Sequence, residues 1–177
     1  MDFWVKDINV SLKVRKFRVG GIQEDVDLGS VPLKYTASSI RGLLRKAVKK
    51  ALNSLNLKNA EESEIFGKDD FEGKVQVLLL NQNEKSEKNV RHGIKIDPLL
   101  GSVKHGHLFS YSFLEIEEIK FILRPLIKIT REEAKILYYG LNYLRYDTIG
   151  GFGSKGMGLI EDVEIDENFK KFVEVKV

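Results

Sequence analysis

The sequence predicts an α+β fold, and two patterns in its 177 residues carry this prediction. Several segments alternate apolar and polar side chains, which is the period of a half-buried strand. Two other segments place apolar side chains on one stripe at helical spacing. These strands and helices follow one another along the chain, and no repeat of about 20–50 residues is present.

Size and composition favour a single domain with its own core. The chain has a mass of 20.2 kDa, and its 42% hydrophobic and 31% charged residues are typical of a globular domain. Cysteine is absent, which excludes disulfides, thiolate metal ligands and a thiol nucleophile. The amino terminus is charged and no apolar run approaches the about 20 residues that cross a bilayer, so we expect a cytoplasmic protein.

The first third of the chain is predicted to form a strand followed by a helix. Alternation over residues 3–19 predicts a long strand, with an irregularity near Arg15. The next stretch has no sustained period and is predicted to be a loop. A helix follows, capped by Ser38 or Ser39 and extending to about Leu55.

The middle of the chain is predicted to hold strands separated by polar stretches. The continuous apolar run at 75–80 predicts a buried strand. Residues 81–107 are polar or rich in glycine, lysine and histidine, and are predicted to be an extended excursion. Residues 108–129 are predicted to form two strands or one bent hairpin.

The last third is predicted to repeat the order of helix and strand. Thr130 and Glu133 form a capping box at the start of a second amphipathic helix. A glycine-rich stretch at 148–158 leads into an alternating strand at 159–165. The complete order is βαββαβ, that of ferredoxin-like (RRM-like) folds, with the excursion at 81–107 as an insertion.

Basic residues are concentrated in the first third of the chain. Residues 1–52 carry eleven basic and five acidic side chains, a surplus of six on a chain whose net charge is only +3. This asymmetry predicts a localised anionic partner, and a solvated basic face is the alternative.

The glycine-rich stretch is a candidate phosphate-binding loop. Gly150, Gly151 and Gly153 would let backbone N–H groups approach a phosphate, and Ser154 and Lys155 would add a donor and a charge. The loop lacks the order of a Walker A motif and enters a strand rather than a helix, so it is not a dinucleotide fingerprint. A flexible turn is the alternative.

A second candidate anion site lies at the start of the first helix. Ser38 and Ser39 would supply hydroxyl and N–H donors there, and Arg41 and Arg45 follow one turn apart. An ordinary helix cap with a basic solvent face is the alternative.

The excursion carries a third group of polar residues, which includes Arg91, His92 and Lys95. His105 and His107 follow in the same excursion, so a histidine metal site is conceivable. A basic loop with uncharged histidines is the favoured interpretation of this spacing.

Together these segments resemble the RAMP superfamily of CRISPR-associated proteins, and most of all the repeated backbone subunit of type III (Csm and Cmr) effector complexes. The glycine-rich loop occurs across that superfamily, whereas an RxGIxID-like stretch followed by an excursion is more specific to the backbone subunit. The matching stretches extend over most of the chain and are Val19-Gly20-Gly21, residues 38–45, Ile65-Phe66-Gly67, residues 91–97 and residues 150–158.

The resemblance implies one domain over 1–177, with a ferredoxin-like palm, a helical lid at 53–74 and a β-hairpin thumb at 81–107. Such subunits stack head to tail along a guide RNA, and their thumbs interrupt the guide–target duplex. The implied partners are guide RNA, target RNA, copies of this chain and other CRISPR effector subunits, with no membrane. Base pairing would recognise sequence, while the protein would read backbone and shape.

The resemblance also implies a set of RNA-binding residues. Serines and arginines at the first helix would hold guide phosphates on the palm, the glycine-rich loop would back that groove, and three residues would lie near the thumb. The full set is Arg18, Lys34, Ser38, Ser39, Arg41, Arg45, Arg91, His92, Lys95, Gly150, Gly151, Gly153, Ser154 and Lys155.

In active members of the family, an aspartate in the loop after the first strand cuts target RNA with a divalent metal. That aspartate is expected between a glycine and a proline, but no aspartate lies between Gly29 and Pro32 here. Asp27 could take the role and bind Mg²⁺, with Asp25 as second candidate, because a hard oxygen ligand needs only to reach the scissile phosphate. Both could equally be ordinary loop carboxylates, so Mg²⁺ is expected only if the subunit is catalytic.

Two other functions are open at this point. A RAMP endoribonuclease that processes guide RNA without metal would use His105, His107 or Tyr35 as acid or base, but such enzymes usually contain two ferredoxin-like halves. An RRM-like binding domain unrelated to CRISPR is disfavoured because the predicted strands show no pair of base-stacking aromatic residues.

Overall fold

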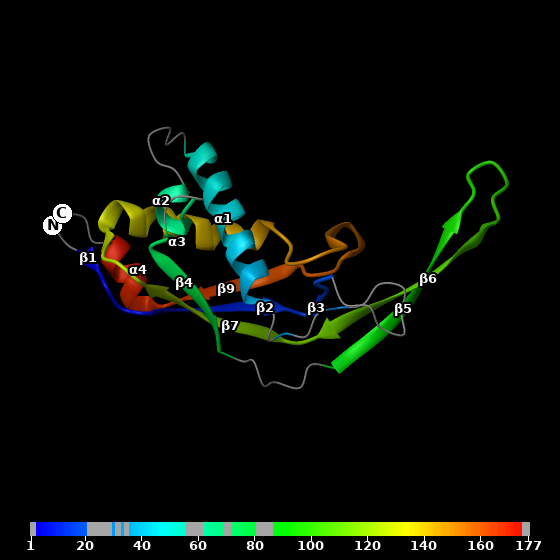
Figure 1. Cartoon of the computed structure of the whole chain (residues 1–177), viewed down its shortest axis with the longest axis horizontal. Helices are drawn as coiled ribbons and strands as arrows, with labels where there is room; N and C mark the ends of the chain where they lie inside the picture. Colours follow the sequence, from blue (N-terminus) through cyan, green and yellow to red (C-terminus); the bar gives the residue numbers. More distant parts are fainter. Residues whose placement is uncertain are drawn as a thin grey trace.

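The structure is a computed structural model that describes residues 3–20, 30, 33, 36–55, 62–68, 72–80 and 87–174 (Figure 1). It is an α+β structure with antiparallel sheets, as the sequence predicts. Within the described ranges, the helices are too short or too polar to cross a membrane.

The body of the molecule is a four-stranded antiparallel sheet. Its strands lie in the order β4 (Val75–Leu79), β7 (Glu118–Pro125), β2 (Ile8–Val14) and β9 (Ile160–Ile165). Two helices cover one face of the sheet (Figure 1). They are α1 (Ala37–Ser54), which comes between β2 and β4 in the chain, and α3 (Arg131–Tyr143), which comes between β7 and β9.

The core lies between this sheet and α1 and α3. In β2, every second side chain is buried, so that Ile8, Val10, Leu12 and Val14 face the helices. Full burial of one such side chain stabilises the fold by about 1.5–3 kcal/mol. The predicted stripe of α1 is present and comprises Ile40, Leu43, Leu44, Ala47, Val48, Ala51 and Leu52.

The two helices begin in different ways. The prediction that Ser38 or Ser39 caps α1 is wrong, because the helix begins after Thr36, whose hydroxyl donates to the carbonyl oxygen of Leu33 at 2.7 Å. At α3 the predicted capping box is confirmed. The hydroxyl of Thr130 accepts the N–H of Glu133 at 3.2 Å, and the Glu133 carboxylate accepts the N–H of Thr130 at 2.9 Å.

The long strand predicted over 3–19 is divided among three sheets. β1 (Phe3–Trp4) pairs with β8 (Ile129–Thr130), β2 belongs to the central sheet, and β3 (Lys16–Phe17) joins a third sheet. The register of β2 against β9 shifts between Lys13 and Val14. A β-bulge of this kind bends a strand, so the predicted irregularity near Arg15 is the point where the chain changes sheet.

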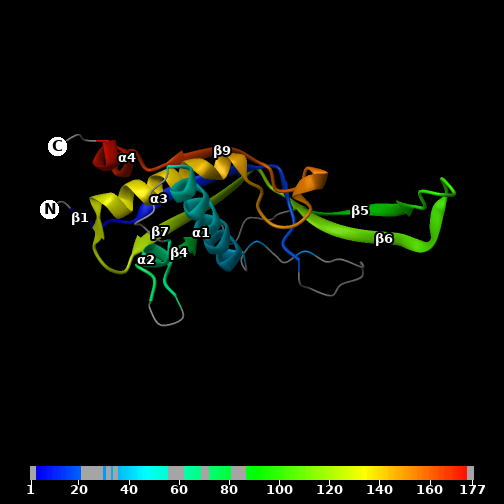
Figure 2. The ribbon, with the colours of Figure 1, turned by 90° about the horizontal axis from the view of Figure 1, so that it is seen from above.

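A long hairpin extends from the body, and Figure 2 shows it projecting beyond the helices. Its strands are β5 (Glu87–Ile96) and β6 (Val103–Glu115), and β3 pairs with the base of β6. The described part of the predicted excursion at 81–107 therefore contains β5, a turn and the first residues of β6. Of the two arrangements predicted for 108–129, the structure has two strands rather than one bent hairpin, because β6 pairs with β5 whereas β7 joins the central sheet.

Four short helical segments complete the described structure: α2 (Ser63–Phe66), η2 (Leu144–Tyr146), η3 (Gly153–Lys155) and α4 (Glu167–Glu174). The sequence patterns did not predict α4. The carboxylate of Asp166 caps it by accepting the N–H groups of Asn168 at 2.9 Å and Phe169 at 3.2 Å. Phe169 is fully buried and packs edge-to-face against Trp4, with 5.2 Å between ring centroids.

Candidate nucleic-acid interface

The glycine-rich loop is fixed against the chain just after β3. The N–H of Gly151 donates to the carbonyl oxygen of Arg18 at 2.7 Å, and the N–H of Ile149 donates to that of Gly158 at 2.8 Å. Gly150 has a φ of +80°, and a Cβ atom there would overlap with the Arg18 carbonyl. Glycine at position 150 thus allows two backbones to meet, which is a different role from the flexible turn considered above.

Arg18 lies beneath this loop rather than on the surface. Its side chain is only 8% exposed, and the guanidinium carbon lies 4.9 Å from the ring centroid of Phe152. Phe152 has a φ of +65°, a conformation that non-glycine residues seldom adopt, and it is only half-buried. The loop therefore places an aromatic ring over a buried cation.

A row of aromatic residues on β6 faces the loop. Phe109, Tyr111 and Phe113 alternate along the strand, so their side chains lie on one face. Tyr111 packs edge-to-face against Phe152, with 5.1 Å between ring centroids. Together with the buried Met157 these rings form a small apolar cluster separate from the main core.

Three further cations lie over these rings, and one of them, Lys16 at 5.9 Å from the ring centroid of Phe113, also pairs with the Glu115 carboxylate at 3.6 Å. The ammonium of Lys155 lies 4.5 Å from the ring centroid of Phe152, 5.0 Å from that of Phe109 and 5.5 Å from that of Tyr111. The guanidinium of Arg91 on β5 lies 5.5 Å from the ring of Phe113. We call this group the cation–aromatic cluster, and it comprises Arg18, Arg91, Phe109, Tyr111, Phe113, Phe152 and Lys155.

The two exposed cations of this cluster, Arg91 and Lys155, lie against rings. Among the residues whose placement is described, neither Arg91 nor Lys155 forms an ion pair, and both are exposed. A cation–π contact at an exposed site contributes about 0.5–1 kcal/mol and leaves the positive charge in place. The cluster is thus a positively charged surface with aromatic faces, which suits phosphates and bases.

The arginines of α1 have a different setting from the one predicted. Arg41 donates to the carbonyl oxygen of Phe66 at 2.6 Å, and the Nε of Arg45 lies 3.8 Å from the Glu62 carboxylate. Both line a groove that also includes Gly67. Part of their donor capacity is therefore used to hold the segment around α2. Ser38 is exposed and Ser39 half-buried in the first turn of the same helix.

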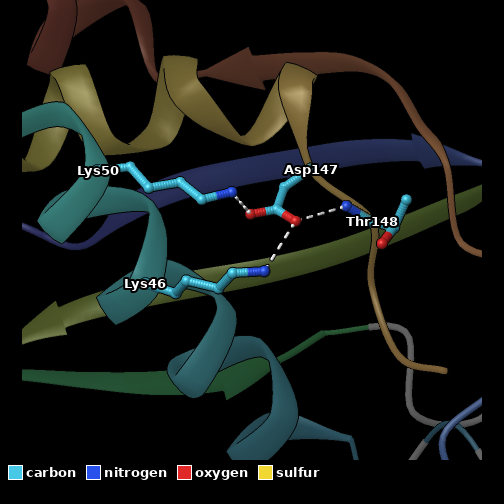
Figure 3. A network of polar contacts seen from close by, with 4 residues as sticks. All are labelled: Lys46, Lys50, Asp147 and Thr148. Atoms are coloured by element: carbon cyan, nitrogen blue, oxygen red, sulfur yellow. Dashed lines mark hydrogen bonds and ion pairs between the residues drawn. The ribbon is translucent and has the colours of Figure 1, made fainter. Parts of the chain in front are cut away.

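A buried carboxylate connects α1 to the root of the glycine-rich loop (Figure 3). Asp147 is 8% exposed and accepts hydrogen bonds from Lys46 Nζ at 3.2 Å, Lys50 Nζ at 2.8 Å and the N–H of Thr148 at 3.0 Å. Burial raises the pKa of Asp147, but the bonds from Lys50, Thr148 and Lys46 together outweigh it. The net result is a lowered pKa.

The lowered pKa of Asp147 predicts a pH-dependent contribution to stability. A carboxylate with a depressed folded-state pKa stabilises the fold fully above its unfolded value of about 3.9 and loses that contribution as pH falls through the folded value. We expect Asp147→Asn to lower Tm most at pH 7, and the difference from wild type to shrink below about pH 4. A Tm difference that stays constant down to pH 2 would contradict this.

Asp7 offers a matched control for this titration. Its exposed carboxylate pairs with Arg124 through two hydrogen bonds, at 3.1 and 2.9 Å, and the bond from Arg124 lowers its pKa. Because solvent screens an exposed pair, we expect Asp7→Asn to change Tm less than Asp147→Asn at pH 7.

The remaining predicted residues of the hairpin lie along β5. His92 and Lys95 are exposed there, farther along the strand than Arg91, and His105 is exposed on β6. No group of three histidine, aspartate or glutamate side chains among the described residues is placed to hold a metal ion. The side chain of His107 lies outside the described part of the chain.

The hairpin ends in an apolar tip held in a defined turn. The carboxylate of Asp97 accepts the N–H groups of Leu99 at 2.9 Å and Leu100 at 3.3 Å. The side chains of Leu99 and Leu100 are 93% and 77% exposed. Two leucines are thus presented to the surroundings of the molecule by a turn that fixes their backbone.

On the face of the central sheet opposite α1 and α3, the described strands β2 and β7 lack the features of an RRM surface. The outward positions on β2 are Asn9, Ser11 and Lys13, and those on β7 include Lys120 and Arg124. No aromatic ring occupies the outward positions of these two described strands, so base stacking of the RRM type has no platform there.

The structure brings together part of the predicted set. Arg18, Gly150, Gly151 and Lys155 lie with Arg91 around the cation–aromatic cluster, and Gly153 and Ser154 belong to the same loop. Arg41 and Arg45 lie at a separate groove. Three predicted residues, Lys34, Asp25 and Asp27, lie outside the described residues, as does Tyr35.

Sequence reasoning missed the aromatic members of the cluster and Asp147. The alternation of Phe109, Tyr111 and Phe113 marks one face of a strand, but the same pattern is typical of core positions. Phe152 carried a clearer signal, because a large ring at the centre of a glycine-rich loop has no role in a simple turn. No sequence pattern points to Asp147, because its lysine partners lie about a hundred positions away in the chain.

The fold and the cluster define an α+β protein with a positively charged surface suited to nucleic acid. In comparisons with known proteins, the model of the RAMP superfamily matches residues 34–161. No curated protein matched the chain. The match extends over most of the sequence, so the chain belongs to the RAMP superfamily of CRISPR-associated proteins, and its family indicates an RNA-binding function.

Proposed function

We propose that this chain is a guide-RNA-binding backbone subunit of a type III CRISPR effector complex. The observation that carries the proposal is the cation–aromatic cluster between the hairpin and the glycine-rich loop. In this proposal the central sheet with α1 and α3 is a ferredoxin-like palm, residues 53–74 are the lid, and residues 81–107 are the thumb of a single domain over 1–177.

The cluster supports guide binding through its charge and its rings. Lys155 and Arg91 would contact phosphates, because neither charge is neutralised by a carboxylate in the described part of the chain. Phe109 and Phe152 are only half-buried, so each has ring surface on which a base could stack. These contacts would hold any sequence, and base pairing with the target would supply the specificity.

The palm would extend the guide path towards α1. Ser38 and Ser39 lie in the first turn of that helix, where N–H groups without helical partners can bind a phosphate. Arg41 has five N–H donors and uses Nη2 in its bond to Phe66, so its guanidinium could hold the segment around α2 and a phosphate together. Lys34, which lies outside the described residues, stays a predicted contact.

The hairpin tip supports the proposed role of a thumb. Apolar wedges such as leucine can separate stacked bases in a duplex, and Leu99 and Leu100 are exposed at a fixed turn. His92 and Lys95 lie on the strand that leads to them. The proposed partners are therefore guide RNA, target RNA, copies of this chain in a row and other effector subunits.

Lys155→Met tests the proposed phosphate contact. Each phosphate neutralised on a single strand contributes about 0.7 to the slope of log K against log salt concentration. We expect the variant to bind a labelled single-stranded RNA more weakly and to reduce the steepness of that slope by about 0.7. Fluorescence anisotropy across a series of salt concentrations measures both quantities.

Lys171→Met is the matched control for this experiment. Lys171 is an exposed lysine on α4, at the end of the molecule opposite the hairpin (Figure 1). We expect it to keep the wild-type affinity and slope. Equal slopes for wild type and Lys155→Met would contradict the phosphate contact, and wild-type binding that does not respond to salt would contradict the proposed function.

Target cleavage is the further part of the proposal, with Asp27 as the residue that would bind Mg²⁺ and Asp25 as second candidate. Neither residue is among those described, so this part rests on the family resemblance. We expect the assembled complex with Mg²⁺ to cut matched target RNA at regular intervals, and Asp27→Ala to lose this cleavage while guide binding is retained. Metal-independent cutting of repeat RNA by the isolated chain would instead indicate a guide-processing enzyme.

A further inference from the structure

Asp147 occupies the position where α1 meets the root of the glycine-rich loop. It follows η2 directly and precedes the first loop residue, Thr148. Its carboxylate accepts bonds from two lysines one turn apart on α1 and from the N–H of Thr148, so it holds both elements at once (Figure 3).

The contact continues from Asp147 into the loop. Thr148 lies under the loop segment of η3, because a Cβ atom on Gly153 would lie 2.5 Å from the Thr148 hydroxyl oxygen. Thr148 also forms an isolated β-bridge with Leu159, at the other end of the loop. Asp147, Thr148 and Gly153 therefore form a continuous path from α1 to the turn that carries Lys155.

The two lysines of this network are held towards the protein. Lys46 and Lys50 are 59% and 44% exposed, whereas the Asp147 carboxylate that they share is only 8% exposed. Two positive charges of α1 share one buried negative charge at this point, which leaves the network with a net charge of +1. The basic surplus of the first third of the chain is therefore partly used inside the fold.

We propose that Asp147 is a positioning residue for RNA binding, and that Lys46 and Lys50 act through it rather than as phosphate ligands. Asp147 fixes the root of the glycine-rich loop on α1, which places Lys155 and Phe152 against the rings of β6. This inference rests on the proposed function, since it concerns the same RNA-binding surface.

Asp147→Asn tests the positioning role. Asparagine keeps an oxygen that can accept the N–H of Thr148, but it removes the charge that attracts the lysines. The variant also gains one net positive charge, which by itself would strengthen RNA binding. We expect affinity for labelled single-stranded RNA to fall about tenfold, as for loss of a charge-assisted bond, and in a folded variant the added positive charge cannot cause that fall.

Folding and affinity are separated by two controls. Circular dichroism at the temperature of the binding assay checks that Asp147→Asn is folded. Asp7→Asn removes the exposed pair with Arg124 at the opposite end of β2, and we expect it to bind RNA as wild type does. If a folded Asp147→Asn protein binds RNA with wild-type or higher affinity, the inference is wrong.

Lys50→Met distinguishes the two possible roles of the lysine. If Lys50 acts through Asp147, the variant lowers affinity with an unchanged salt slope, and Asp147→Asn/Lys50→Met binds no more weakly than Asp147→Asn. A slope reduced by about 0.7, as expected for Lys155→Met, would show that Lys50 contacts a phosphate and would overturn the inference. Failure of the wild-type chain to bind RNA would instead overturn the proposed function itself.

Discussion

Gly150→Ala is expected to lose RNA affinity by at least about tenfold and to destabilise the chain by about 3 kcal/mol. Gly150 has a φ of +80°, and a Cβ atom there would overlap with the carbonyl oxygen of Arg18. That carbonyl accepts the N–H of Gly151, so the added methyl group would separate the loop from the chain after β3. For a chain of this size the loss of stability corresponds to a fall in Tm of about 6–12 °C.

The same loop provides the control for Gly150→Ala. Gly156 has a φ of +76°, nearly the value at Gly150, but a Cβ atom there would lie in open space. Gly156→Ala should therefore incur only the strain of the left-handed conformation, about 1 kcal/mol, and should keep RNA affinity near that of wild type. Equal losses of affinity in the two variants would show that the contact with Arg18 does not set the binding surface.

Several elements of the fold follow from local patterns in the sequence. The stripe of α1, the alternation of β2 and the capping box of Thr130 and Glu133 each depend on residues within a few positions of one another. Such patterns are readable because the period of a helix or strand fixes which side chains share a face. The cap of α1 was misplaced because Ser38 and Ser39 are favourable capping residues, while Thr36 uses its hydroxyl for a turn.

The division of the strands among sheets could not be predicted in this way. The alternation of apolar and polar residues from 3 to 19 continues across the point where the chain leaves the central sheet. It continues because alternation shows only that one face of a strand is buried, and does not show which sheet the strand belongs to. The pairing of β2 with β7, and of β3 with the base of β6, joins segments that are distant in sequence. No local period specifies which strand is the neighbour of another.

In the candidate site, too, the sequence predicts the residues that form local patterns but not the contacts between residues distant in the chain. In the sequence, closely spaced glycines identified 150–158 as a candidate phosphate-binding loop. Arg18 and Arg91 were candidate RNA-binding residues because they are basic. The structure adds that their charges lie against rings of β6. Arg41 and Arg45 had an equally good pattern, yet one donates to Phe66 and the other approaches Glu62. The sequence shows where cations are, whereas only the fold shows which of them already have protein partners.

The packing of the two helices predicts opposite effects for the same substitution at two glycines. Gly140 of α3 lies against α1, and a Cβ atom there would overlap with the Cγ2 of Val48 and lie 3.0 Å from its Cα. Gly42 of α1 is exposed, and a Cβ atom there would meet no atom within 4 Å. In both helices alanine is intrinsically favoured over glycine by about 0.5–1 kcal/mol.

Gly140→Ala should therefore lower the free energy of unfolding by about 2 kcal/mol, because overpacking exceeds the gain in helix propensity. Gly42→Ala should raise it by about 0.5–1 kcal/mol. In thermal denaturation these changes correspond to a fall of about 4–8 °C and a rise of about 2 °C. A rise in Tm for both variants would mean that α1 and α3 can separate at no cost.

A second substitution identifies the contact responsible. Val48→Ala removes the Cγ2 atom that the new methyl group would overlap, although by itself it leaves a space in the core and is destabilising. In the double variant with Gly140→Ala the two changes should compensate, so that its stability exceeds the sum of the single effects by about 1 kcal/mol or more. Strict additivity would place the strain of Gly140→Ala in the backbone near Val48 Cα rather than in its side chain.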